Sequence, residues 1–111
     1  MKNTPNDKRT LRVATVQFES QPGDKQANFR KIETFLTQAA AQDVRLVIFP
    51  ECCITGYWFI RNLSVTQLGA LAEPIPDGPS TRRLSDLARQ HGITLGAGLV
   101  EAGEAGVYHN S

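Results

Sequence analysis

A glutamate that directly follows an apolar strand is the residue of this sequence best placed for chemistry. The run from Leu46 to Phe49 is uninterrupted and rich in β-branched and aromatic residues, which is typical of a parallel strand covered on both faces. Pro50 ends this strand because it has no N–H to donate to a neighbouring strand. Glu51 is therefore predicted at a strand's carboxyl end, where open α/β sheets bind ligands. A carboxylate in such a crevice can act as a general base.

Two adjacent cysteines follow this glutamate, and their position alone suggests a nucleophile. Neighbouring side chains of extended backbone point to opposite faces, so one of the two cannot readily turn back to Glu51. Cys52 and Cys53 can hardly form an ordinary disulfide, which needs a suitable separation. His91 and His109 add too few ligands for a zinc cluster, so no metal site is predicted. We expect both cysteines to be small buried hydrophobic residues.

Two aromatic residues lie a few positions beyond the glutamate, in a stretch that we expect to be irregular through Trp58. Gly56 allows the backbone a turn there. Tyr57 and Trp58 have two interpretations, which the sequence leaves open. They line a substrate pocket beside Glu51, or they cover the core.

The elements that must position these residues begin with a βαβ unit. Residues 11–18 form a β-branched run that predicts the first strand. Asp24 is a plausible N-cap for a helix that ends near Gln42 and whose apolar residues recur at helical spacing. The strand over 46–49 follows, so the two strands are expected to pair in parallel through the helix between them.

The second half of the chain continues the α/β order. Its predicted elements are a helix over 65–72, a helix from Pro79 to His91 closed by Gly92, a strand over 93–99 and a hairpin into 107–111. Gly96 and Gly98 inside a strand indicate a close approach of another backbone or helix. They do not precede a helix, as a phosphate-binding glycine pattern would.

Length and charge restrict the class of protein. The 111 residues carry 12 Lys and Arg against 11 Asp and Glu, and 41% are hydrophobic. Such a chain is one domain at most and can bury roughly two thirds of its unfolded surface. Charges of both signs are interspersed, which predicts no nucleic-acid partner. The longest apolar stretch, 52–60, is far shorter than the roughly 20 residues of a membrane span, so no membrane partner is expected.

The first ten residues are polar and lack the apolar run of a signal peptide. We expect residues 1–10 to be a flexible polar tail. The chain has no disulfide framework, so a cytoplasmic location in a reducing compartment is the simpler expectation.

Several segments together resemble one enzyme family. Phe49-Pro50-Glu51 followed by Thr55-Gly56-Tyr57 is similar to the first signature of the nitrilase, or carbon–nitrogen hydrolase, superfamily. Other segments agree with that family in order and spacing: residues 12–17, Gly23-Asp24 with Asn28, residues 96–101, and Tyr108-His109-Asn110-Ser111. The resemblance covers nearly all of the chain after its first ten residues.

The resemblance implies that residues 11–111 are the N-terminal portion of a four-layer α-β-β-α sandwich of the α/β class. It implies a Glu-Lys-Cys site that hydrolyses amide, carbamoyl or nitrile C–N bonds without a metal or organic cofactor. Glu51 would be the general base, and Glu101 would support the site through hydrogen bonds. Family members often form homo-oligomers. The family's Lys and Cys follow the Tyr-Asn-Ser segment, so we expect this chain alone to lack hydrolase activity.

Other functions remain open beside this one. A strand that begins at Val107 and stops at Ser111 favours a piece of a longer protein. A noncatalytic α/β module that binds a small molecule or a partner is the main alternative. A nucleotide-binding fold is less favoured, because the loop over 19–24 lacks the glycine pattern that brings phosphate to a helix N-terminus.

Overall fold

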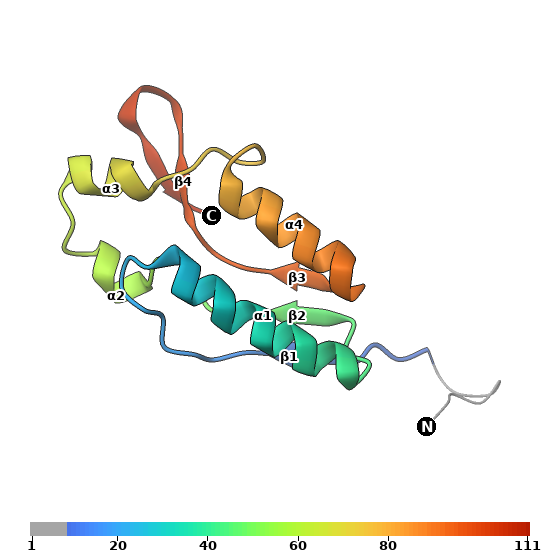
Figure 1. Cartoon of the computed structure of the whole chain (residues 1–111). Coiled ribbons are helices and arrows are strands. Elements are labelled where there is room, and N and C mark those ends of the chain that lie inside the picture. Colours follow the sequence, from blue (N-terminus) through green and yellow to red (C-terminus); the bar gives the residue numbers. More distant parts are fainter. Residues whose placement is uncertain (1–8) are drawn as a thin grey trace.

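Residues 9–111, which the computed structural model describes, form a parallel three-stranded sheet and a separate antiparallel hairpin (Figure 1). The elements in chain order are β1 (Val13–Thr15), α1 (Lys25–Ala41), β2 (Leu46–Ile48), α2 (Tyr57–Ile60), α3 (Val65–Leu71), α4 (Pro79–His91), β3 (Thr94–Gly96), β4 (Val100–Ala102) and β5 (Tyr108–Asn110). The sheet has the order β1-β2-β3, and β4 pairs with β5. The predicted parallel βαβ unit and the α/β class are confirmed. Most of the predicted polar tail, residues 1–8, lies outside the described residues.

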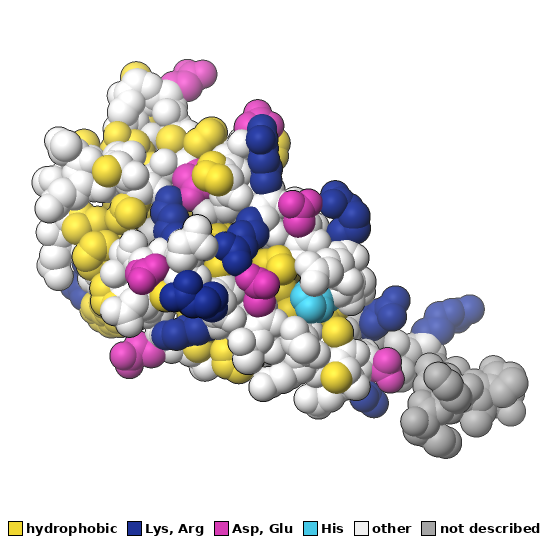
Figure 2. Space-filling view, viewed as in Figure 1, with side chains coloured by type: hydrophobic (Ala, Val, Ile, Leu, Met, Phe, Trp, Pro, Cys, Tyr) yellow, Lys and Arg dark blue, Asp and Glu magenta, His cyan; other side chains and the backbone are white. Residues whose placement is uncertain are grey.

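The two long helices cover one face of the sheet. Val47 is fully buried between Ala14 and Leu95, its neighbours on β1 and β3, and this row packs into the core. The helices contribute Phe29, Ile32 and Leu36 from α1, and Leu84 and Leu87 from α4. Their outer surface carries interspersed Lys, Arg, Asp and Glu side chains (Figure 2).

The other face of the sheet is open, and here one prediction from the sequence is wrong. The run over 46–49 was expected to be covered on both faces, but Ile48 is 43% exposed and Val13 on β1 is 53% exposed. Side chains alternate along a strand, so these two residues point away from the helices. No described element packs on them.

The helix ends follow the predicted chemistry. The Asp24 side chain accepts a hydrogen bond from the Ala27 N–H at 2.9 Å, which caps the start of α1. Such a cap stabilises a helix by about 1 kcal/mol. Pro79 opens α4, and Gly92 closes it in the left-handed conformation with a φ of 64°.

Strand lengths differ from the prediction because strands extend only where partners exist. The first strand was expected over 11–18, but the sheet pairs only Val13–Thr15 with β2. The strand expected over 93–99 pairs as β3 only over Thr94–Gly96, and β4 begins after it at Val100. Leu99 leaves the parallel sheet and exchanges two backbone hydrogen bonds with Ser111, at 2.9 and 3.1 Å, which continues the hairpin. The stretch expected to be irregular through Trp58 contains the short helix α2.

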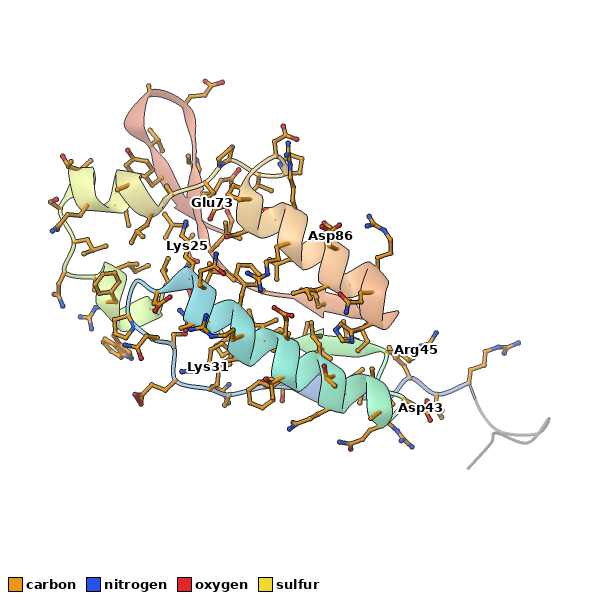
Figure 3. The ribbon with its side chains drawn as sticks, in the orientation of Figure 1. Lys25, Lys31, Asp43, Arg45, Glu73 and Asp86 are labelled. Carbon is orange, nitrogen blue, oxygen red and sulfur yellow. The ribbon has the colours of Figure 1, made fainter. Side chains whose placement is uncertain are left out.

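A partly buried ion pair joins α1 to the segment before α4. Lys25 and Glu73 point toward one another (Figure 3), with Nζ and Oε2 2.6 Å apart. Glu73 also accepts hydrogen bonds from the Ser80 backbone N–H at 2.7 Å and the Ser80 hydroxyl at 2.6 Å. Burial alone would raise the pKa of Glu73, but the hydrogen bonds from Lys25 and Ser80 outweigh it and hold the pKa below its ordinary value. The charged carboxylate therefore stabilises the first turn of α4.

This pair predicts how stability depends on pH. The folded-state pKa of Glu73 lies below the unfolded value of about 4.3, so its contribution is fully present above that value. It is lost as the pH falls through the folded pKa. We expect Glu73→Gln to lower the free energy of unfolding by about 2 kcal/mol at pH 7. The difference from the wild type should shrink in urea unfolding at pH 3, whereas a difference that stays constant with pH contradicts this role.

Candidate active site

Glu51 lies on the wall of a cavity beside the carboxyl end of β2. The cavity has a volume of about 440 Å³ and an aromatic lining. Its walls are formed by Phe18, Glu19, Ser20, Pro22, Pro50, Glu51, Gly56, Tyr57, Trp58 and Phe59. The structure thus brings three of the predicted site residues, Glu51, Tyr57 and Trp58, to one cavity. The carboxylate of Glu51 is exposed there.

Hydrogen bonds fasten the two loops that form the cavity walls. Asn28 of α1 is fully buried and donates to the carbonyls of Gln21 and Ile54, both at 2.9 Å. The side-chain oxygen of Asn28, Oδ1, accepts a hydrogen bond from the Gln21 N–H at 2.7 Å. The Gly23 N–H donates to the Thr55 carbonyl at 2.9 Å. Because these buried polar groups are satisfied, the loops after β1 and β2 are held as one unit.

The backbone of Gly98 packs directly against the turn that contains Glu51 and Cys52. A Cβ atom at Gly98 would lie 2.4 Å from the backbone nitrogen of Cys52, closer than real contacts allow. The Gly98 carbonyl also accepts a hydrogen bond from the Ile54 N–H at 3.3 Å. The close backbone approach predicted for Gly98 is therefore confirmed. At Gly96 a Cβ would meet only the tip of the Ile48 side chain, at 3.0 Å.

Asn110 at the end of β5 holds the Glu51 carboxylate. The Asn110 Nδ2 donates to Glu51 Oε1 at 2.5 Å, and Asn110 Oδ1 accepts a hydrogen bond from the Cys52 thiol at 3.2 Å. Sequence reasoning included Asn110 only within a family segment and assigned it no role. An available signal was its position in a predicted strand, where asparagine is uncommon.

Glu101 lies in the hairpin and contacts the residue next to Asn110. Its Oε1 accepts a hydrogen bond from the Ser111 hydroxyl at 2.7 Å. Glu101 lies in the middle of β4, opposite His109. The Glu101 carboxylate is therefore bound to Ser111, which is the residue after Asn110, the partner of Glu51.

Neither cysteine lines the cavity. Cys52 and Cys53 are free and fully buried. Burial raises the pKa of both thiols, and the neighbouring charge of Glu51 raises that of Cys52 further. A nucleophilic cysteine needs the thiolate form, so these environments oppose a nucleophilic role for either residue.

The aromatic wall is formed by the start of α2. Gly56, with a φ of 94°, turns the chain into this helix. Tyr57 and Trp58 are 41% and 71% exposed, and their rings meet edge to face with centroids 5.8 Å apart. The Arg61 guanidinium lies 4.3 Å from the centroid of the Trp58 ring, close enough for a cation–π contact. Both aromatic side chains line the cavity and lie outside the core cluster.

Residues 9–111 contain no group of three or more His, Cys, Asp or Glu residues arranged to hold a metal ion. None of the helices in this part of the chain has the length and apolar character needed to cross a membrane.

Comparisons with known proteins agree on one family. Residues 12–111 match the family model described as carbon-nitrogen hydrolase. A nitrilase from Pyrococcus abyssi is 35% identical over 101 residues, which cover 91% of this chain and 37% of that protein. The chain therefore spans about a third of the length of the curated relatives it matches.

Solved structures are similar as well. The crystal structure of Saccharomyces cerevisiae Nit3, a member of the nitrilase superfamily, matches with a TM-score of 0.70 and 30% identity, over 90% of this chain and 37% of that one. An amidase mutant from Nesterenkonia sp. AN1 carries the acetamide moiety of fluoroacetamide on its active-site cysteine. It matches with a TM-score of 0.60 and 27% identity, over 81% and 32% of the two chains. The expected nitrilase-like α/β fold class is confirmed.

The contact at Gly98 generates a stability prediction. Gly98→Ala should lower the free energy of unfolding by about 1–3 kcal/mol, because the added methyl group forces the Cys52 backbone to move. Gly96→Ala is the matched control, since the flexible tip of Ile48 can give way. Urea unfolding of the two variants measures the difference. Equal losses of stability would show that the approach at Gly98 is not tight.

Proposed function

The chain belongs to the carbon–nitrogen hydrolase family, and from this premise we propose that Glu51 is the general base of a site that hydrolyses nonpeptide C–N bonds. The observation that carries the proposal is the place of its carboxylate. Glu51 lies on the wall of the aromatic cavity, and only one of its two oxygens is hydrogen-bonded to Asn110. Across residues 9–111, Oε2 has no hydrogen-bond partner, which leaves it available to take a proton.

The proposed reaction proceeds through a cysteine thiol. Glu51 removes the thiol proton, and the thiolate attacks the carbonyl carbon of an amide. Glu51 then returns this proton to the amide nitrogen, so that ammonia leaves from the tetrahedral intermediate and a thioester remains. The free carboxylate next takes a proton from water, the hydroxide attacks the thioester and releases the acid, and the proton goes back to the cysteine sulfur. The active-site cysteine of the amidase from Nesterenkonia supports this chemistry.

The nucleophile and the lysine of this site are proposed to lie outside the 111-residue sequence. Support comes from the two cysteines of the chain, which are buried away from the cavity. Lys25, for its part, is bound to Glu73. A general base without a nucleophile has nothing to activate, so we propose that this chain alone does not turn over substrate.

Tyr57 and Trp58 are proposed to contact the substrate, which is an amide, a carbamoyl compound or a nitrile. Their rings offer apolar surface to the same cavity that Glu51 lines. Glu101 is proposed to support the site indirectly, through its hydrogen bond with Ser111 beside Asn110.

The role of Glu51 is tested in the protein encoded by the full reading frame that contains this sequence. Glu51→Gln should lower kcat for ammonia release from butyramide by about 100-fold or more, because it removes the base. Glu19→Gln is the matched control, since Glu19 lines the same cavity, and its kcat should change by less than about threefold. Wild-type turnover in Glu51→Gln would refute the proposed base.

The 111-residue chain by itself separates catalysis from binding. We expect no ammonia release from butyramide above that of its own Glu51→Gln variant. Ammonia release that depends on Glu51 would place a nucleophile within these 111 residues.

Trp58 is the single tryptophan of the chain, so its fluorescence reports whether butyramide enters the cavity. Saturable quenching without turnover in either protein favours the binding module over the hydrolase.

A further inference from the structure

Two hydrogen bonds connect the buried Cys52 to Glu51 through one amide group. The Cys52 Sγ donates to Asn110 Oδ1 at 3.2 Å, and Asn110 Nδ2 donates to Glu51 Oε1 at 2.5 Å. We propose that Cys52 is a positioning residue, whose thiol fixes the Asn110 carboxamide with its NH2 group toward the Glu51 carboxylate. The inference rests on the proposed function of Glu51 as the base.

The Asn110 carboxamide needs a hydrogen-bond partner such as the Cys52 thiol because it can rotate by 180° and exchange the positions of its oxygen and its NH2 group. The two ends of an asparagine carboxamide are similar in shape but opposite in hydrogen bonding, one an acceptor and the other a double donor. If the Asn110 group turned by half a rotation, its oxygen would face the oxygen of Glu51, and two acceptors would meet. A donor at Cys52 favours the productive orientation, because it binds the carbonyl oxygen at the far end.

The protonation state of Cys52 agrees with a donor role. A thiolate is an acceptor and would favour the reversed amide. Burial and the charge of Glu51 both raise the pKa of the Cys52 thiol, so the S–H group persists at neutral pH. The same two influences that oppose a nucleophilic role for this cysteine therefore preserve it as a hydrogen-bond donor.

The positions of both partners are set by separate parts of the fold. The Cys52 carbonyl accepts a hydrogen bond from the Gly56 N–H at 2.8 Å, and its nitrogen lies against Gly98. Asn110 is held by pairing with Val100 in the hairpin. The thiol thus meets a carboxamide that is carried by another element and anchored independently.

Cys53 provides a control within the same turn. It is also fully buried, but its thiol donates to the Gly98 carbonyl oxygen, 4.0 Å from the sulfur, and not to Asn110. Removal of either thiol takes a sulfur atom from the core. Only removal of the Cys52 thiol takes a donor from Asn110.

The test uses the 111-residue chain and side-chain amide resonances of Asn110 in nuclear magnetic resonance spectra. We expect one NH2 proton of Asn110 to be shifted downfield by its bond to the carboxylate. Cys52→Ala should lose that shift, whereas Cys52→Ser, which keeps a donor, and Cys53→Ala should retain it. A folded Cys52→Ala variant with wild-type Asn110 resonances overturns the proposal, as does a Cys52→Ser variant that fails to retain the shift.

A second measurement keeps the proposal testable if Cys52→Ala does not fold. In the Cys53→Ala chain, the single infrared S–H band belongs to Cys52. We expect this band at lower frequency than that of a free thiol, and Asn110→Ala should return it to the free position. A free-thiol band in the folded Cys53→Ala chain overturns the proposal. Neither measurement depends on turnover, so failure of Glu51 as a base remains a separate result.

Discussion

The close backbone contact between Gly98 and the turn at Glu51 and Cys52 is the constraint on which the candidate site depends. A side chain at Gly98 would collide with the Cys52 nitrogen, so only glycine lets the segment after β3 pass directly beneath this turn. The contact ties Glu51, the proposed general base, to the end of the parallel sheet. It also directs the chain into the hairpin, which returns with Asn110 beside Glu51. One small residue therefore determines both the position of the carboxylate and the approach of its partner.

Around this contact, hydrogen-bonded polar groups fix the loops and helices that the small sheet does not hold by itself. Asn28 joins the loops after β1 and β2, and the ion pair of Lys25 with Glu73 joins α1 to the start of α4. Both sets of groups are hydrogen-bonded, as buried polar groups must be to avoid a desolvation penalty. The aromatic side chains of α2 remain free to form a cavity wall, because the core does not need them. The loops that form the site are thus fixed by hydrogen bonds, while its cavity stays open to solvent.

Local patterns made much of this arrangement predictable. The helices of residues 25–41 and 79–91 carried their own caps and apolar spacing, and Glu51 was placed at a strand end by Pro50 and the apolar run before it. The partner of Glu51 was not predictable, because 59 residues separate it from Asn110. Burial of Glu73 was missed for the same reason, since Lys25 lies 48 residues away. Strand ends and the open sheet face also depend on pairing and packing partners, which a single sequence does not display.

Native-state hydrogen exchange at Ile54 tests the central claim most directly. The Ile54 N–H donates to the Gly98 carbonyl, while the Phe49 N–H donates to the Gly96 carbonyl within the sheet, at 2.8 Å. If the contact at Gly98 fixes the turn of Glu51 to the sheet, the two amides open together and are protected to the same degree. An Ile54 amide that exchanges as fast as an unstructured one, while Phe49 stays protected, would show that the turn moves independently of the sheet and would contradict the account.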